Sequence, residues 1–183
     1  MRHLSKNVLR GFYIILALAL LITPSLAVEE GGLRGSNHRT GPNGLAIIKR
    51  FEGFSATAEW DYTRYAIGYG CSYDKAFQMF PDNPKDEETG MITLTEEQAE
   101  QVLMAELSGC EQSVNNYLTR HNLTLNQNQF DALVSFTYNL GSAWMTGQNS
   151  DGTPYMIRNL LENTPSSGWT PQLVQEAFGA WNE

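Results

Sequence analysis

The sequence is poor in the residues that bind transition metals. It holds two cysteines, Cys71 and Cys110, and three histidines among 183 residues. These residues do not stand at the spacing of a zinc-binding motif. We therefore expect no metal site.

Several catalytic motifs are also missing. The chain has no GxSxG elbow, no Walker loop, no HExxH pair and no Rossmann fingerprint. Their absence sets aside the corresponding serine, phosphate-binding, zinc-dependent and dinucleotide-dependent chemistries. Carboxylates remain as the candidate catalytic groups.

Positive charge is scarce as well. The chain has 12 lysines and arginines against 20 acidic residues, and three of the basic ones, Arg2, Lys6 and Arg10, lie within the first 27 residues. The rest of the chain keeps nine basic residues and all 20 acidic ones, a net charge of −11. Because phosphate binding needs clustered lysine and arginine, we expect no nucleic acid partner.

Long apolar runs are missing after the N-terminus. The run at residues 11–22 (GFYIILALALLI) follows the three basic residues and precedes the small residues Ser25 and Ala27. This layout is typical of an export signal, so residues 1–27 are predicted to be a signal peptide cleaved after Ala27. The product would be secreted to the extracellular space or cell wall, without stable membrane association. A retained membrane anchor is the alternative, because the run could reach nearly to Val28.

The part after the signal is predicted to hold one domain. Residues 28–41 (VEEGGLRGSNHRTG) are rich in glycine and polar residues and show no periodicity, which favours a flexible leader. Residues 42–183 are long enough for one good core and too short for two ordinary domains.

The hydrophobic pattern of residues 42–183 predicts a mainly helical α+β domain with a small β hairpin. The expected elements, in order, are a helix from Asn43, a hairpin over 58–70, a loop-rich insertion over 71–93, a long helix opened by a capping box at Thr95, a helix from Asn126 ending at Gly141, and shorter helices over 156–162 and 171–181.

Glu52 is the carboxylate with the most suggestive setting. It lies between Phe51 and Phe54 near the C-terminal end of the first helix, and both apolar surroundings and the helix dipole there would raise its pKa. A carboxyl group protonated near neutral pH can donate a proton to a glycosidic oxygen. Asp61, nine residues later in the polar hairpin, would stay ionised and complete an acid/base pair. From spacing alone, a surface glutamate and a turn aspartate remain the alternative.

A longer stretch around Glu52 resembles a known family. The segment Gly44–Gly70 (GLAIIKRFEGFSATAEWDYTRYAIGYG) is similar to the active-site signature of the phage-type lysozymes, glycoside hydrolase family 24. Residues 94–107 (LTEEQAEQVLMAEL) and 126–141 (NQNQFDALVSFTYNLG) resemble the next two helices of that family, in order. The resemblance covers residues 43–145 clearly and residues 156–181 more loosely.

The resemblance implies a lysozyme-like fold and a muramidase. Such an enzyme hydrolyses the β-1,4 bond between N-acetylmuramic acid and N-acetylglucosamine in peptidoglycan, without metal or cofactor. Glu52 would be the general acid, and Asp61 would position or activate the attacking water. The expected partner is the glycan strand, bound by a monomer. A catalytically idle glycan-binding module and a lytic transglycosylase remain as alternatives.

Two further residues are candidates for substrate binding. By resemblance, Asn139 matches a position at which the family contacts sugar, whereas its alternative role is a helix C-cap. Tyr69, together with Trp60 and Tyr62, could stack on sugar rings, whereas packing within the hairpin is the alternative.

The chain also departs from the family pattern at three places. Ala66 stands where the family commonly has a threonine that helps to hold the water, so either Thr63 or Tyr65 substitutes from the hairpin or the water is held differently, and the resemblance leaves inversion or retention unassigned. Cys71 replaces a histidine that usually pairs with an acid on the long helix, here matched by Glu106.

Cys110 lies one helical turn beyond that acid, so the comparison with the family implies a disulfide between Cys71 and Cys110. Two separate buried thiols are the alternative. Family members also usually continue past a segment like 177–183, which leaves open a C-terminally truncated domain.

Overall fold

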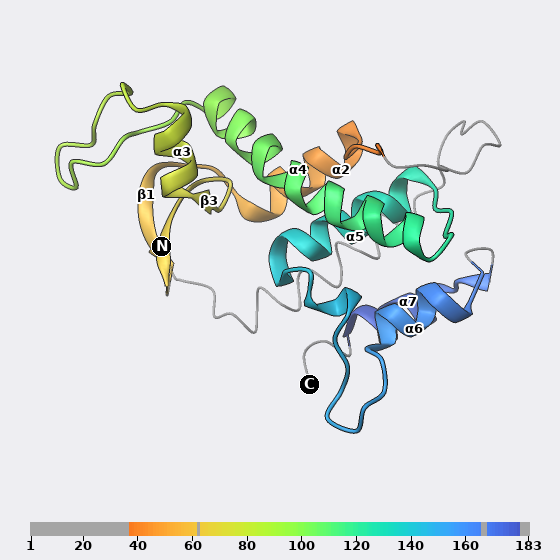
Figure 1. Cartoon of the computed structure of the whole chain (residues 1–183). Helices are drawn as coiled ribbons and strands as arrows, with labels where there is room; N and C mark the ends of the chain where they lie inside the picture. Colours follow the sequence, from red (N-terminus) through yellow and green to blue (C-terminus); the bar gives the residue numbers. More distant parts are fainter. Residues whose placement is uncertain (1–36, 62, 166–167, 180–183) are drawn as a thin grey trace. The chain divides into compact units, whose positions relative to one another are not determined.

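The computed structural model describes residues 37–61, 63–165 and 168–179 (Figure 1). These residues form six α-helices, one short 3₁₀ helix and one three-stranded antiparallel sheet, so the predicted α+β class is confirmed. The predicted signal peptide and most of the predicted leader lie outside the described residues. Within the described ranges, no helix is both long and apolar enough to cross a membrane.

The chain divides into two compact units. The helical unit comprises the described residues up to Leu45 together with those from Cys110 onward, and the sheet unit comprises Ala46–Gly109. The chain passes from one unit to the other inside helix α2 (Pro42–Glu52) and again inside helix α4 (Glu96–Arg120).

The predicted hairpin forms the centre of the sheet unit. Strand β1 (Ser55–Asp61) pairs antiparallel with β2 (Arg64–Gly68), and β2 pairs with the short strand β3 (Cys71–Ser72). The register places Asp61 opposite Arg64 and Trp60 opposite Tyr65, with an irregularity between Ser55 and Glu59. The paired strands therefore end at Asp61 and Arg64.

The insertion expected over 71–93 is less irregular than predicted. It begins with β3 and continues into helix α3 (Tyr73–Met79), and a loop follows α3. A helix of seven residues is too short for its periodicity to stand out in the sequence, which is why the pattern indicated only a loop.

Helix α4 begins as its sequence predicts. The side chain of Thr95 accepts a hydrogen bond from the backbone N–H of Gln98, and the Gln98 side chain accepts one from the N–H of Thr95. This is the reciprocal capping box. The apolar residues along one face of α4 are buried, namely Ala99, Val102, Leu103, Leu107, Val114 and Leu118, whereas Cys110 is half-buried.

The helical unit contains α5 (Gln127–Leu140), the 3₁₀ helix η1 (Ala143–Met145), α6 (Met156–Asn163) and α7 (Pro171–Gly179). Helix α5 has the caps that the sequence predicts. Asn126 and Gln129 form a capping box, and Gly141 ends the helix with a φ of 79°. The buried Trp144 fixes η1 against α5, because its indole N–H donates to Oγ1 of Thr137 at 3.1 Å.

The end of the predicted leader is held by helices α4 and α5 of the same unit. The backbone N–H and hydroxyl of Thr40 both donate to Glu111 at 2.8 Å, and the N–H of Gly41 donates to Asp131 at 2.9 Å. Arg39 forms an ion pair with Glu111 at 2.8 Å. These residues therefore belong to the folded part, which begins before the predicted boundary at Pro42.

Candidate active site

Glu52 is the last residue of α2. The following residue, Gly53, has a φ of 71° and donates its N–H to the carbonyl oxygen of Lys49 at 3.1 Å, which closes the helix. The half-buried Glu52 side chain lies against the turn after β2, since a Cβ atom added at Gly70 would stand 3.0 Å from Oε2 of Glu52. The prediction that Glu52 lies at the helix end is confirmed.

Asp61 is the last residue of β1 and is exposed. Its cross-strand partner Arg64 extends toward the same turn, where its Nη2 donates to the carbonyl oxygen of Gly70 at 3.2 Å. Gly70 is thus contacted by Arg64 at its carbonyl oxygen and approached by Glu52 at its Cα. The structure therefore brings the end of α2 and the tip of the Asp61 hairpin to one turn of the sheet unit.

The two faces of the hairpin carry different side chains. Directly paired residues point to the same face, so Asp61 and Arg64 share a face with the next in-phase pair, Glu59 and Ala66. Trp60 and Tyr65 occupy the opposite face, with ring centroids 5.1 Å apart and exposed fractions of 56% and 40%.

This arrangement excludes Tyr65 as a substitute for the missing threonine hydroxyl, and the role of Thr63 stays a prediction. Tyr65 points away from the face of Ala66, so it does not replace that hydroxyl. Glu59, which stands opposite Ala66, is the polar residue that the strand register supplies there. The sequence pattern missed Glu59 because the register depends on the irregularity near the start of β1.

Tyr69 does not have the predicted sugar-stacking geometry. Its side chain is only 2% exposed and its hydroxyl donates to Oε1 of Glu96 at 2.8 Å, so the ring has no open face for a sugar. Burial raises the pKa of Tyr69, and the hydrogen bond to Glu96 acts in the same direction, which keeps the hydroxyl protonated. Tyr62, also named for stacking, lies outside the described residues.

Lys49 of α2 lies beside Tyr69 and Glu96. Its Nζ lies 5.1 Å from the centroid of the Tyr69 ring, 2.5 Å from Oε2 of Glu100 and 4.0 Å from Oε1 of Glu96. The hydrogen bond with Glu100 raises the pKa of Lys49, so the ammonium group stays charged. The sequence pattern missed these contacts, although Lys49 stands three residues before Glu52 and so shares its helix face.

Asn139 lies in the helical unit, inside α5. Its Nδ2 donates to the carbonyl oxygen of Ser135 at 2.9 Å, and its side chain is half-buried. The C-cap of this helix is Gly141, so the alternative role of Asn139 as the cap is wrong. Its contact with sugar stays a prediction.

The predicted disulfide is absent from the part of the chain that the structure describes. The fully buried Cys71 instead directs its Sγ toward the carbonyl oxygen of Tyr69 at 3.9 Å. The link expected between β3 and α4 is made by a hydrogen bond, since the N–H of Ser72 donates to Oε1 of Glu106 at 2.8 Å. Glu106 therefore keeps a tie to this strand without a histidine or a disulfide.

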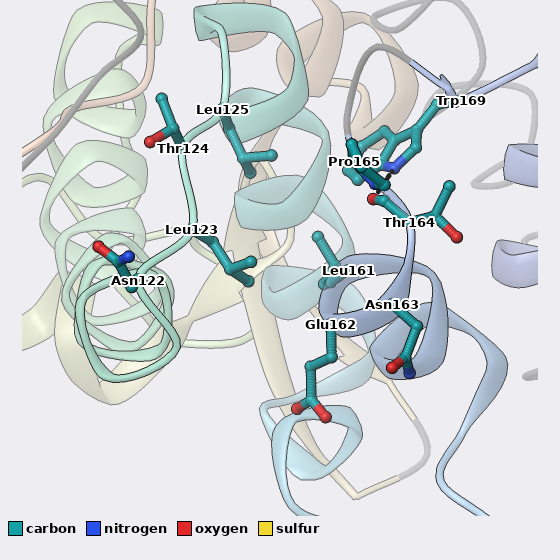
Figure 2. A pocket seen from close by; sticks show the side chains of 10 residues that line it. All are labelled: Asn122, Leu123, Thr124, Leu125, Leu161, Glu162, Asn163, Thr164, Pro165 and Trp169. Atoms are coloured by element: carbon teal, nitrogen blue, oxygen red, sulfur yellow. Dashed lines mark hydrogen bonds between the residues drawn. The ribbon is translucent and has the colours of Figure 1, made fainter.

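A groove of about 470 Å³ in the helical unit is bordered by the loop after α4 and by the end of α6 (Figure 2). Trp169 at its edge donates its indole N–H to the carbonyl oxygen of Thr164 at 2.9 Å. Among the described residues, no group of three or more His, Cys, Asp or Glu side chains is arranged to hold a metal ion.

Comparisons with known proteins agree with the fold. The family model described as phage lysozyme matches residues 49–181, a range that contains both Glu52 and Asp61. A solved structure, the muramidase domain of SpmX from Asticaccaulis excentricus, superposes with a TM-score of 0.51 at 28% sequence identity. That match covers 69% of this chain and 71% of the other.

The chain has no match among the curated proteins compared with it. The matched family model nevertheless spans well over half of the 183 residues and includes the whole sheet unit from Lys49 onward. The chain belongs to the phage lysozyme family, and at the level of that family it is a peptidoglycan hydrolase of the glycoside hydrolase class.

Proposed function

We propose that the chain is a muramidase that hydrolyses the β-1,4 bond between N-acetylmuramic acid and N-acetylglucosamine in peptidoglycan. One observation carries the assignment of residues. Glu52 ends α2 with its carboxylate at Gly70, and the same turn is contacted by Arg64, the cross-strand partner of Asp61. The match to the phage lysozyme family supports the reaction.

Glu52 acts as the general acid in this proposal. This role requires that the Glu52 carboxyl group carries its proton when the substrate binds. As the glycosidic bond breaks, the Glu52 proton moves to the leaving-group oxygen and the bonding electrons go with that oxygen. The developing positive charge rests on the anomeric carbon and its ring oxygen.

Asp61 acts on the water in this proposal. It is exposed at the hairpin tip, where solvent reaches it directly. The water oxygen forms the new bond to the anomeric carbon, and a water proton passes to a carboxylate. Glu59 shares the face of Asp61 and stands opposite Ala66, so we propose that it helps to hold the water where other family members use a threonine.

Glu52→Gln tests the proton donor. The amide keeps the shape of the side chain but cannot donate a carboxylic proton, so we expect release of reducing ends from purified peptidoglycan to fall by roughly 10²-fold or more. Glu88→Gln is the matched control, because it removes an exposed carboxylate from the loop of the same unit. An unchanged rate in Glu52→Gln would rule out Glu52 as the acid.

The products distinguish the alternatives. Hydrolysis adds one water across the bond, whereas a lytic transglycosylase leaves an anhydro sugar that is lighter by one water. Mass spectrometry of the released fragments separates these outcomes. Binding of the wall without release of fragments by the wild-type chain would instead identify an idle glycan-binding module.

We also propose that residues 1–27 are an export signal removed after Ala27. The expected product is a chain in the culture medium whose N-terminal residue is Val28. Intact-mass measurement of the medium and of carbonate-washed membranes checks this. Full-length chain that resists the wash would show a retained anchor instead.

A further inference from the structure

Four side chains form a connected group beside the proposed proton donor. Lys49 on α2 forms an ion pair with Glu100 on α4 at 2.5 Å and lies 5.1 Å from the centroid of the Tyr69 ring. Tyr69 in turn donates its hydroxyl proton to Glu96 on α4 at 2.8 Å. We call Lys49, Tyr69, Glu96 and Glu100 the Lys49 network. It joins α2, the turn after β2 and the first turns of α4, all within the sheet unit.

The Lys49 network adjoins Glu52 on two sides. Lys49 precedes Glu52 by three residues, so the two side chains leave the same face of α2 about one turn apart. Tyr69 directly precedes Gly70, whose Cα lies against the Glu52 carboxylate. Any movement of the Tyr69 ring would therefore move the surface on which the carboxylate rests.

We propose that Tyr69, with its partners Lys49 and Glu96, is a positioning residue that fixes the Glu52 carboxylate against Gly70. This inference rests on the proposed function only in giving Glu52 the role of proton donor. It replaces the sugar-stacking role that the sequence suggested for Tyr69. The buried ring and its anchored hydroxyl suit a structural support better than a contact with substrate.

We expect the Lys49 network to contribute more to the position of Glu52 than to the free energy of folding. The side chains of Glu96 and Glu100 are 63% and 38% exposed, and ion pairs at such sites add little to the free energy of folding. A proton donor is more demanding, because displacement by about 1 Å can cost roughly 10²-fold in rate. Loss of the Tyr69 hydroxyl should therefore change catalysis more than stability.

Tyr69→Phe tests the inference, with Tyr73→Phe as its matched control. Each variant loses one phenolic hydroxyl in the sheet unit, since the Tyr73 oxygen accepts a hydrogen bond from the N–H of Ile92 at 3.2 Å. Using soluble peptidoglycan fragments, we expect kcat to fall about tenfold in Tyr69→Phe, with KM within about twofold of the wild type. In Tyr73→Phe, kcat should stay at the wild-type level. Its melting temperature should nevertheless fall by about as much as that of Tyr69→Phe.

Two variants of Glu96 sharpen the test. Glu96→Gln keeps a side-chain oxygen that can accept the hydrogen bond from the Tyr69 hydroxyl, so it should retain the wild-type kcat. In Glu96→Ala, kcat should fall as much as in Tyr69→Phe. The double variant Tyr69→Phe with Glu96→Ala should be no slower than either single variant, because both remove the same hydrogen bond. Additive losses would contradict a shared positioning role.

A second measurement does not depend on enzymatic activity. Carbon-13 NMR of the Glu52 carboxyl group gives its titration midpoint in the full chain. A displaced carboxylate meets different surroundings, so we expect a shift of about 0.5 pH unit or more in Tyr69→Phe and none in Tyr73→Phe. An inactive wild-type chain would defeat the proposed function but leave this comparison valid. Equal Glu52 titration and equal kcat in the two variants would overturn the inference.

Discussion

Gly70 is a residue at which one added carbon has two separate effects. Its φ of 74° lies in the left-handed region, and a Cβ atom there would stand 3.0 Å from Oε2 of Glu52. The first effect is backbone strain of about 1–2 kcal/mol. The second is displacement of the Glu52 carboxylate from its resting place.

Gly70→Ala should therefore lose both stability and activity, the activity by on the order of tenfold. Gly90→Ala is the matched control, because Gly90 has a φ of 68° with no atom within 4 Å of the added carbon. We expect both variants to show similar losses in the free energy of unfolding measured with urea. Only Gly70→Ala should lose rate per folded molecule, and equal rates would show that the Glu52 contact is unimportant.

The role of Tyr69 also illustrates a limit at the residue scale. A tyrosine in a short aromatic hairpin is compatible with packing or with sugar stacking, and both alternatives fit the sequence. Burial to 2% exposure decides between them, because it depends on where α4 lies over the ring and on Glu96 as partner. Trp60 and Tyr65 retain exposed rings on the other face of the hairpin.

At the scale of elements, the N-terminus of α2 is capped from a distance. The sequence predicted a helix from Asn43, but Asn43 is the second residue of α2 and is exposed, so it is not the cap. The N–H of Gly41 donates instead to Asp131 of α5, which also accepts a hydrogen bond from Gln127 at 2.7 Å. A carboxylate suits this position because the first turn of a helix has unpaired N–H groups and a positive dipole end. The helix that carries Glu52 is thus held at its start by the buried carboxyl group of Asp131.

Asp131 should make the free energy of unfolding depend on pH. Burial raises the pKa of Asp131, although hydrogen bonds from Gly41 and Gln127 oppose that change. The folded state therefore holds the proton more tightly than the unfolded state does. Stability contributed by this group should rise as the pH falls through the folded-state pKa, and level off below the ordinary value of 3.8.

Urea unfolding of the wild type and Asp131→Asn at several pH values measures this effect. The wild type should gain stability relative to the variant as the pH falls from neutral toward 4. Asp151→Asn is a control in which the pH effect on stability should have the opposite sign. Hydrogen bonds from the side chain and backbone of Thr153 lower the pKa of Asp151. There the wild type should lose relative stability only as the pH falls below the ordinary value of 3.8, so the series must extend below that pH. Parallel curves for wild type and Asp131→Asn would contradict the assignment.

At the scale of the whole molecule, the net negative charge should affect how the protein approaches its substrate. The proposed exported chain carries −11 before histidine is counted, and bacterial walls are themselves anionic. Repulsion should slow the approach to such a polymer at low salt, where the screening length is about 30 Å at 0.01 M, and less so at 0.15 M, where it is about 8 Å.

We therefore expect wall hydrolysis to accelerate by roughly two- to tenfold when salt is raised over that range. The initial rate on purified peptidoglycan, followed against sodium chloride concentration, gives the answer. A soluble uncharged oligosaccharide is the control substrate and should show little salt dependence. A rate on walls that falls steadily with added salt would indicate a local positive surface that dominates the encounter.

The sequence by itself determined the local features of this protein. The capping box at Thr95, the caps at Asn126 and Gly141, the hairpin and the position of Glu52 at a helix end all follow from residues close together in the chain. Such features depend on hydrogen bonds and backbone angles within one turn, so neighbouring residues suffice to predict them.

The tertiary structure alone decided which distant groups meet. It brought Gly70 against Glu52, placed Glu59 opposite Ala66 and buried Tyr69 beside Glu96. It also capped α2 with Asp131, 90 residues beyond Gly41. These contacts depend on strand register and on the packing of α4 and α5, and no local pattern specifies either. The position of Glu52 at a helix end was thus visible in the sequence, while the turn at Gly70 against which its carboxylate lies was not.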